Sequence, residues 1–338
     1  MCVTPPGGCH PDRRQWVGSR SPLSRPHSRR VSAWTSSQHK EFLYEDARSV
    51  LRQAPGKFEI TDLVLDDPRQ NEIRVKMVAS GLCHSDDHMA TGDLPVAVYP
   101  VCGGHEGGRG GSSNPWAPTP PGFEPGDKVI FSFLPACGKC RWCSSGGHQN
   151  LCDLGANVLV GSRWEDPPTS FRLQLEDGTP VGQALGISTF SEYTTVAVDS
   201  AVKVPDDTPL EKACLLGCAI GTGWGSAVRT GEVSAGDTVL VFGAGGIGSA
   251  AVQGAAHAGA ARVIVVEPVA FKRDQSLTFG ATHAVATAEE GIELAQSFTN
   301  GQGADVAIVT VGVITGEHVA QAFSGIRKQG ERGGDRAR

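Results

Sequence analysis

Several features are scarce in this chain of 338 residues. Aromatic residues make up 6% of it, and no uninterrupted apolar run is long enough to cross a bilayer. The opening residues lack the apolar core of a secretory signal. There is no internal repeat and no coiled-coil heptad. These absences exclude a membrane-spanning, secreted or repeat protein, and they predict a cytoplasmic protein with no membrane partner.

Charge is distributed unevenly along the chain. The formal net charge is −6, but residues 1–40 carry seven Lys/Arg against one Asp, a net of +6, which leaves −12 for the remainder. An acidic body argues against nucleic acid as a partner. The basic opening segment is rich in Arg, Ser and Pro without apolar periodicity, so we expect 1–46 to be a disordered or non-homologous extension. The alternatives are a transit peptide, or upstream sequence translated from a start site set too early.

What the chain does contain, 44 glycines among short apolar runs, indicates a loop-rich α/β protein. From about 56, stretches such as "KFEITDLVLDD" and "EIRVKMVASG" have strand length and are separated by turn residues. Later stretches such as "DTVLVFG" and "ARVIVVE" are buried-type strands alternating with Ala-rich helical segments. This pattern predicts a β-rich domain over 47–205 and a doubly wound parallel sheet over 206–338.

Four of the ten cysteines are clustered in "CGKCRWCSSGGHQNLC". Cys137, Cys140 and Cys143 are separated by two residues each, and Cys152 closes the loop. Such gaps let successive thiolates fold back on one ion, so the segment predicts a tetrahedral zinc site. A site closed by four sulfurs has no open position, and its role would be structural. Free cysteines and an iron–sulfur cluster are the alternatives.

The segment "GAGGIG" supplies Gly243, Gly245, Gly246 and Gly248 between a buried strand and a helical stretch. In that context the glycines allow the backbone to approach a pyrophosphate at a helix N-terminus. Glu267 ends the next strand, 24 residues after Gly243, where an acid can bind ribose hydroxyls. Its charge repels a 2′-phosphate and predicts NAD over NADP. A glycine-rich turn without a ligand remains the alternative.

A second metal site is predicted from three separate segments. "GLCHSDDH" contributes Cys83, "CGGHEGG" contributes His105 beside Glu106, and "CLLGC" contributes Cys218. A Cys₂His set leaves a fourth coordination position for water or substrate. Such a site can perform catalysis rather than only hold the fold together.

With these motifs in view, the chain resembles the zinc-dependent medium-chain alcohol dehydrogenases over roughly 47–328. It resembles most the bacterial branch that includes nitrosoaniline-dependent enzymes, near the class III, formaldehyde-oxidising type. The resemblance implies a chaperonin-10-like catalytic domain and a Rossmann domain. It also implies two zinc ions per chain, NAD as cofactor, and reversible oxidation of a small alcohol to an aldehyde.

The resemblance also implies a role for each matched residue. Cys83, His105 and Cys218 would hold the catalytic zinc with Glu106 as a close neighbour, and Asp86 would orient His105. Ser85 would accept the proton of the alcohol and His88 would pass it to solvent.

The other matched positions concern the cofactor and the substrate. His84 would contact the cofactor pyrophosphate, and Thr222 would lie beside the nicotinamide. Lys272 is either a second ribose contact or a solvated surface lysine. Leu94, Phe133 and Phe190 would line the substrate slot, with ordinary core positions as the alternative.

The chain departs from the family pattern in three places. Eight residues separate Cys143 from Cys152 where the family has seven. The segment 108–121 replaces a valine-rich strand, and the match ends near 328, in the manner of shifted reading frames. We therefore expect loss of the strand after Glu106 and a Rossmann domain truncated after its fourth strand. An exposed apolar edge would then make the chain aggregate and lose activity.

These departures bear on assembly and on alternative functions. The family commonly dimerises through the sixth Rossmann strand, so the homo-oligomer of the full-length family is not expected for this chain. Two other readings stay open at this point. One is a thiol-dependent formaldehyde dehydrogenase, and the other is a non-catalytic truncated zinc protein or degraded gene product.

Overall fold

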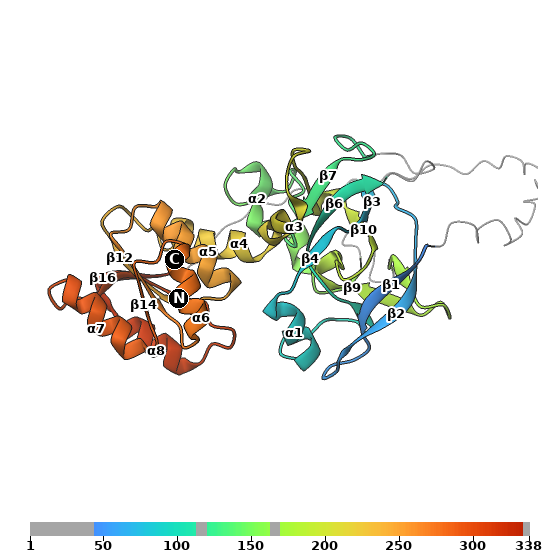
Figure 1. Cartoon of the computed structure of the whole chain (residues 1–338). Coiled ribbons are helices and arrows are strands. Elements are labelled where there is room, and N and C mark those ends of the chain that lie inside the picture. The colour runs from blue at the N-terminus through green and yellow to red at the C-terminus, as the bar shows by residue number, and fades with distance from the viewer. Residues whose placement is uncertain (1–43, 113–119, 163–169, 334–338) are drawn as a thin grey trace, which may run out of the picture. The chain divides into compact units, whose positions relative to one another are not determined.

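The computed structural model describes residues 44–112, 120–162 and 170–333 (Figure 1). Most of the expected extension, 1–43, lies outside the described residues. The first strand, β1 (Tyr44–Leu51), begins inside the stretch assigned to that extension, so the folded part starts before residue 47. Among the described helices, none is both long and apolar enough to cross a membrane.

The first part of the fold is a closed barrel of short strands. Its order is β1-β2-β8-β9-β5. The members after β1 are β2 (Phe58–Leu65), β5 (Val101–Cys102), β8 (Leu173–Gln174) and β9 (Pro180–Gln183). Alternate residues of β2, such as Leu63 and Leu65, face a core shared with Leu173 and Val181. This period of two is the pattern that a strand with one buried face requires.

A second, six-stranded antiparallel sheet completes the predicted β-rich domain. Its order is β10-β3-β6-β7-β11, and β4 pairs with β6. Its strands are β3 (Glu72–Lys76), β4 (Ala79–Gly81), β6 (Glu106–Ser112), β7 (Lys128–Phe131), β10 (Tyr193–Ala197) and β11 (Ala201–Lys203). Two short helices lie between strands of this half, α1 (His84–Thr91) after β4 and α2 (Arg141–Ser144) after β7.

The expected loss of the strand after Glu106 is wrong for the described residues. The strand β6 pairs with β4, β3 and β7, although most of its residues are glycine. Backbone hydrogen bonds form the ladder, and they need no valine side chains. The part of the altered segment between 113 and 119 lies outside the described residues.

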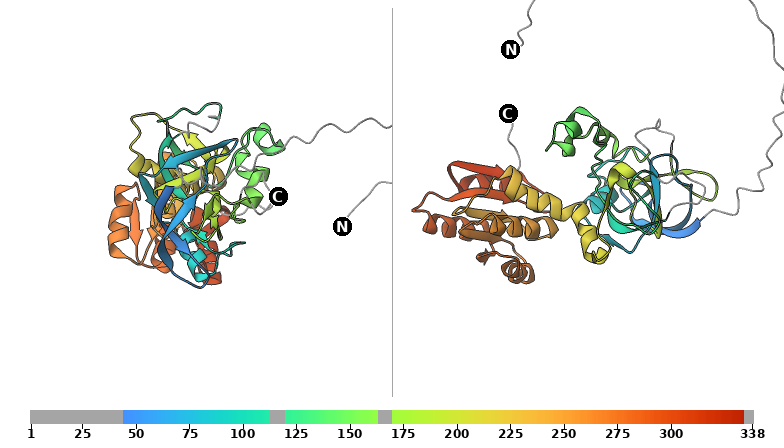
Figure 2. Two further views of the ribbon diagram at one scale, coloured as in Figure 1. Left: turned by 90° about the vertical axis from the view of Figure 1, so that its right-hand side faces the viewer. Right: turned by 90° about the horizontal axis from the view of Figure 1, so that it is seen from above.

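The boundary between the two halves falls later than residue 205. In α3 (Leu210–Ala213), Leu210 and Ala213 pack with Ile130 of β7 and Val204. This segment therefore belongs with the strand-rich half. The chain then continues through α4 (Ala219–Gly225) and a π-helical turn over Ser226–Thr230, the yellow run in Figure 2, to the parallel sheet.

The parallel sheet has the order β14-β13-β12-β15-β16, with helices on both faces. The strands are β12 (Thr238–Phe242), β13 (Arg262–Val266), β14 (His283–Val285), β15 (Ala304–Val309) and β16 (Ile326–Gly333). The helices are α5 (Gly246–His257), α6 (Ala270–Thr278), α7 (Ala288–Phe298) and α8 (Gly316–Ser324).

Successive residues of β12 face opposite layers of this sheet. Val239 and Val241 belong to a cluster that includes residues of α5. Leu240 and Phe242 belong to a cluster that includes Ala295 of α7 and Ala322 of α8. A strand buried on both faces reads as one continuous apolar run, which is why "TVLVF" predicts a central parallel strand. The doubly wound fold is thus present as expected.

The expected end of the sheet at its fourth strand is wrong. The strand β16 pairs parallel to β15, so the apolar β15 is internal and not an exposed edge. Arg327 of β16 is anchored by the carboxylate of Asp305 in β15, with Nε and Oδ1 2.5 Å apart. The charged, glycine-rich sequence of 326–333 suggested a tail, because it lacks the β-branched residues typical of strands.

Candidate active site

The first residues of the site sit at the start of α1. Cys83 precedes the helix as its N-cap, and the Cys83 backbone N–H donates to the side chain of Asp86 at 3.2 Å. The same carboxylate accepts the backbone N–H of Gly104 at 3.0 Å. Asp86 is 4% exposed and so joins the beginning of α1 to the segment that carries His105.

His105 is fully buried, and its ring is held between a carboxylate and an aromatic side chain. Its Nδ1 lies 3.4 Å from Oδ1 of Asp86, and the Phe133 ring packs edge-on with its centroid 6.0 Å away. Both ring nitrogens are buried, and neither makes a hydrogen bond among the described residues. A buried nitrogen without a partner is costly unless something else binds it. The Asp86 contact therefore has the geometry expected of a group that orients a metal-binding imidazole.

Glu106 and Cys218 reach the same place because two backbone segments come close together. Oε1 of Glu106 accepts the backbone N–H of Ala219, the residue after Cys218, at 3.0 Å. A Cβ at Gly81 would lie 2.0 Å from Oε2 of Glu106, so only glycine fits at that point of β4. Burial raises the pKa of the Glu106 carboxyl.

These residues form one potential metal group. One ligand atom from each of Cys83, His105, Glu106 and Cys218 lies within 4.8 Å of the others. The nearby Cys218 thiol and the His105 ring lower the pKa of Cys83 to about 3, while the Cys83 thiolate and burial raise the pKa of Cys218. Burial opposes protonation of His105, but Asp86 and the Cys83 sulfur outweigh it and raise its pKa to about 9. The donors suit a divalent cation such as zinc, which binds thiolate and imidazole.

The four lobe cysteines form a second group with the same separation. One sulfur each of Cys137, Cys140, Cys143 and Cys152 lies within 4.8 Å of the others. The backbone N–H of Cys140 donates to the Cys137 sulfur at 3.4 Å, as expected around thiolate ligands. The segment between Cys143 and Cys152 includes the short 3₁₀ turn Gln149–Leu151. The arrangement has the closed character of a structural zinc site.

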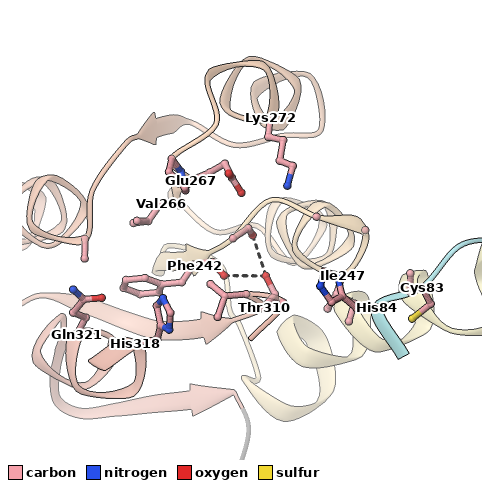
Figure 3. A pocket seen from close by; sticks show the side chains of 18 of the residues that line it. Cys83, His84, Phe242, Ile247, Val266, Glu267, Lys272, Thr310, His318 and Gln321 are labelled. Carbon is pink, nitrogen blue, oxygen red and sulfur yellow. Dashed lines mark hydrogen bonds between the residues drawn. The ribbon is translucent and has the colours of Figure 1, made fainter. Parts of the chain in front are cut away.

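The glycine segment of the parallel sheet forms a cradle at the start of α5. A Cβ at Gly248 would lie 2.0 Å from the carbonyl oxygen of Gly243, so the strand and helix can meet this closely only without a side chain. The Thr310 hydroxyl, 3.0 Å from the Phe242 oxygen and 2.9 Å from that of Gly243, holds the end of β12 (Figure 3). The N-terminus of α5 is therefore open to an anionic group.

Glu267 lies at the edge of this cradle. It is 4% exposed, and its carboxylate accepts the N–H groups of Ala244 at 2.8 Å and Val269 at 3.0 Å. In Figure 3, Lys272 of α6 points toward the same space from above. Glu267 and Lys272 line the same cavity, so the Lys272 side chain is placed where it can contact a ligand.

A single cavity of about 810 Å³ joins the predicted cofactor residues to the first metal group. Cys83 and Glu106 line one part of it, and the glycine segment and Glu267 line the middle. Gln321 of α8 lies farthest from Cys83 among the labelled residues of Figure 3, and His318 of the same helix lies near it. This volume falls within the range of cofactor and ligand sites.

The predicted proton-transfer residues lie beside the metal group. Ser85 lines the cavity, and its Oγ is 3.6 Å from the Cys83 sulfur. His84 and His88 also line it, and their rings pack edge-on with centroids 5.3 Å apart. His88 is half-buried and its Nε2 is buried, and its release of a proton to solvent stays a prediction. His84 packs against Gly312, in the loop after β15.

The remaining predicted residues do not line this cavity. Thr222 lies in α4, and its backbone N–H donates to the carbonyl oxygen of Cys218 at 3.0 Å. Phe133 contacts the His105 ring, which puts it beside the metal group. Phe190 packs on Phe58, and Leu94 packs in the cluster around Met89. Only Phe133 of the three proposed substrate residues is thus in contact with a candidate metal ligand.

Sequence reasoning missed several residues that line the cavity. Thr310, Glu289, His318 and Gln321 come from loops and helices far along the chain. No motif marks them, because their place in the cavity depends on the order of strands in the sheet. Their location after the ends of predicted strands could have indicated them, because ligands of doubly wound sheets bind outside the carboxyl ends of the strands.

Comparisons with known proteins agree with this geometry. Residues 69–206 match the alcohol dehydrogenase GroES-like domain, and 246–332 match the zinc-binding dehydrogenase domain. The NDMA-dependent alcohol dehydrogenase of Amycolatopsis methanolica is 49% identical over 83% of this chain and 74% of its own length.

Solved structures with the same architecture include two with a TM-score of 0.75. One is an alcohol dehydrogenase zinc-binding domain protein from Burkholderia ambifaria, 30% identical over 84% of this chain and 74% of its own. The other is the benzyl alcohol dehydrogenase of Acinetobacter calcoaceticus, 26% identical over 86% and 76%.

The chain therefore belongs to the zinc-dependent medium-chain alcohol dehydrogenases, enzymes that use a nicotinamide cofactor. The resemblance inferred from the motifs is confirmed. These relatives are named as alcohol dehydrogenases, which does not favour the thiol-dependent formaldehyde alternative.

Proposed function

We propose that this chain oxidises an alcohol to an aldehyde, reversibly, with hydride transfer to NAD at a zinc site formed by Cys83, His105 and Cys218. One observation carries the proposal. The first metal group and the glycine cradle open into the same cavity, so a metal-activated alcohol and a nicotinamide can meet there. When bound, zinc supplies Lewis-acid activation of the alcohol oxygen, and NAD accepts the hydride.

In this proposal the protein's own groups fix the zinc ligands in place. Asp86 lies 3.4 Å from Nδ1 of His105, so we assign Nε2 as the nitrogen that would bind the ion together with Cys83 and Cys218. The burial of both ring nitrogens without a hydrogen bond among the described residues supports a bound ion at this imidazole. Glu106 stands close enough to contact the ion but already accepts the N–H of Ala219, so we assign it a neighbouring position.

The proton of the alcohol would be taken by Ser85. The hydroxyl lies in the cavity wall beside Cys83, with its Oγ 3.6 Å from the Cys83 sulfur. His88 is one turn farther along α1 and lines the same cavity. His88 as a whole is half-buried, although its Nε2 is buried, and we assign it the release of the proton to solvent.

For the cofactor, the backbone of 243–248 would hold the pyrophosphate and Glu267 the ribose hydroxyls. The carboxylate of Glu267 is buried at the edge of the cradle, where a 2′-phosphate would meet its charge. That repulsion is the basis for proposing NAD rather than NADP. Lys272 and His84 are assigned to the ribose and the pyrophosphate.

The four lobe cysteines would hold a second zinc ion with a structural role. Small alcohols and aldehydes are the proposed substrates, and Phe133 is the residue best placed to contact them beside His105. Thr222 does not line the cavity itself, and its assignment to the nicotinamide rests on its place one turn after Cys218, whose carbonyl oxygen accepts its N–H.

Aerobic purification followed by zinc analysis and an NADH-absorbance assay with short primary alcohols tests the proposed reaction. We expect alcohol-dependent NADH formation that disappears when His105→Ala removes a ligand. Folded, zinc-loaded protein that binds NAD but reduces none with any primary alcohol would contradict the proposal.

A further inference from the structure

The cavity extends beyond the residues that the proposed function uses. Past Phe242 and Val266, its wall is formed by residues 286–289 and by two polar side chains of α8, His318 and Gln321. In Figure 3 these two lie together beside Phe242, on the side of Glu267 opposite to Cys83. Nothing in the proposed chemistry of alcohol oxidation requires polar groups at this distance from the metal.

The order of groups in NAD decides what occupies this end. The nicotinamide must lie at the Cys83 end to exchange hydride there, and the glycine cradle receives the pyrophosphate. The second ribose then meets Glu267. The only part of the cofactor left for the far end is the base.

The two side chains differ in which of their polar groups are available to bind the base of the cofactor. His318 is the third residue of α8, and its Nδ1 accepts the backbone N–H of Thr315 at 3.2 Å. A neutral ring with Nδ1 as acceptor carries its proton on Nε2, which is then a donor. Gln321 follows three residues later, so it shares a face of the helix with His318. Its amide makes no hydrogen bond among the residues that the structure describes, and the residue is half-buried.

A glutamine amide is matched to adenine in particular. Its carbonyl oxygen accepts from the N6 amino group while its NH₂ donates to N7. At the same edge hypoxanthine presents two acceptors, O6 and N7, so whichever way the amide turns there, its own oxygen faces another acceptor.

We propose that Gln321 and His318 recognise the base of the cofactor, with Gln321 selecting adenine over 6-oxopurines. The inference rests on the proposed function, since it takes NAD as the ligand of the cavity. Neither residue touches the reacting atoms, so their effect falls on binding and not on the chemical step.

The test compares NAD with nicotinamide hypoxanthine dinucleotide by isothermal titration of the intact, zinc-loaded chain. We expect the unaltered protein to bind NAD roughly tenfold more tightly. Gln321→Leu, which keeps the side chain's size, is expected to weaken NAD binding roughly tenfold and bring the two ligands to similar affinity. Gln302→Leu, at an exposed position outside the cavity, is the matched control and should change neither.

Two substitutions separate the roles of His318. His318→Asn keeps an acceptor near the Nδ1 position for Thr315 and removes the Nε2 donor, so NAD affinity should fall with the melting temperature unchanged. His318→Gln keeps a donor near Nε2 and should retain more affinity. For all variants kcat at saturating NAD should stay within about twofold of the unaltered chain while KM for NAD rises.

Two results would overturn the inference, and they are distinguishable. If NAD binds but Gln321→Leu leaves the ratio of the two affinities unchanged, base recognition by Gln321 is wrong and the proposed function stands. If neither dinucleotide binds to folded, zinc-loaded protein, the proposed function and this inference both fail.

Discussion

At the scale of single residues, the contact between Ser85 and Cys83 has a measurable consequence. We expect Ser85→Ala to lower turnover about 10²-fold or more, the usual contribution of a positioned proton acceptor, because water replaces the hydroxyl imperfectly. Zinc content should stay unchanged, since Ser85 is not among the proposed ligands. NADH formation and elemental analysis on the same preparation check both parts.

The control for that substitution is Ser297→Ala on α7, whose hydroxyl bonds only to the carbonyl oxygen of Leu294 at 2.7 Å. It should leave turnover unchanged. Full turnover in Ser85→Ala would mean that another group accepts the proton.

Glu267 provides the second residue-scale prediction. We expect Glu267→Ala to narrow the difference in affinity between NAD and NADP, because the change removes a buried negative charge from the site of the 2′-phosphate. Affinity for NAD should fall as well, since the ribose hydroxyls lose their acceptor. Fluorescence titration with NADH and NADPH measures both.

The control is Glu293→Ala, at an exposed position of α7 outside the cavity. It changes the net charge by the same amount but leaves the glycine cradle unaltered. It should preserve the preference of the unaltered chain. Equal affinity of the unaltered chain for both cofactors would remove Glu267 as the discriminating residue.

At the scale of elements, the close approach of β4 to the metal group is a point of weakness. A methyl group at Gly81 would lie 2.0 Å from Oε2 of Glu106 and 2.8 Å from Cδ2 of Leu215. Gly81→Ala should therefore cost about 1–3 kcal/mol of stability through overpacking. It should also displace Glu106 and Cys218 and reduce occupancy of the catalytic metal position, while the four-cysteine lobe keeps its ion.

Gly225→Ala in α4 is the control, since its added methyl group meets no atom within 4 Å and alanine favours helix. It should be neutral or slightly stabilising. Chemical denaturation and zinc analysis distinguish the two variants, and equal behaviour would show that the backbone near Gly81 adjusts without cost.

The elements also show why part of the fold was mispredicted. Strands β6 and β16 have sequences dominated by glycine or charge, and side-chain patterns gave no reason to expect them. Both gain their order from neighbours, β6 from β4, β3 and β7 and β16 from β15. Tertiary pairing overrides strand propensity in such segments, because the ladder is made by backbone groups.

At the scale of the whole molecule, we expect two zinc ions per chain, one for each of the two groups. Replacing Cys137 and Cys140 with serine should remove one ion, and replacing Cys83 with serine should remove the other. Plasma emission spectrometry on gel-filtered protein gives the ratio. A zinc content unaffected by all three replacements would show that the ions bind elsewhere.

The zinc and cofactor chemistry could be predicted from sequence because few residue types can perform it. Cysteines at fixed spacing predict a metal site, and glycines between a strand and a helix predict a dinucleotide site, without knowledge of the rest of the fold. The joining of Cys83 to the glycine cradle in one cavity, and the placement of Gln321 at its far end, could not be predicted in this way. They depend on contacts between segments far apart in the sequence, about 160 residues for Cys83 and Gly243 and about 80 for Phe242 and Gln321, which no local pattern records.

The first metal group ties together positions that are distant along the chain. Cys83 and Cys218 are 135 positions apart, from 83 to 218, with His105 between them. A bound ion therefore acts as a cross-link that closes a long loop in the unfolded ensemble. For a covalent link of that length the chain-entropy model gives about 5 kcal/mol. Most of the strand-rich half lies inside the loop. An ion bound for catalysis therefore also stabilises this half against thermal unfolding. A chelator should lower the melting temperature of the strand-rich half even in the unaltered chain.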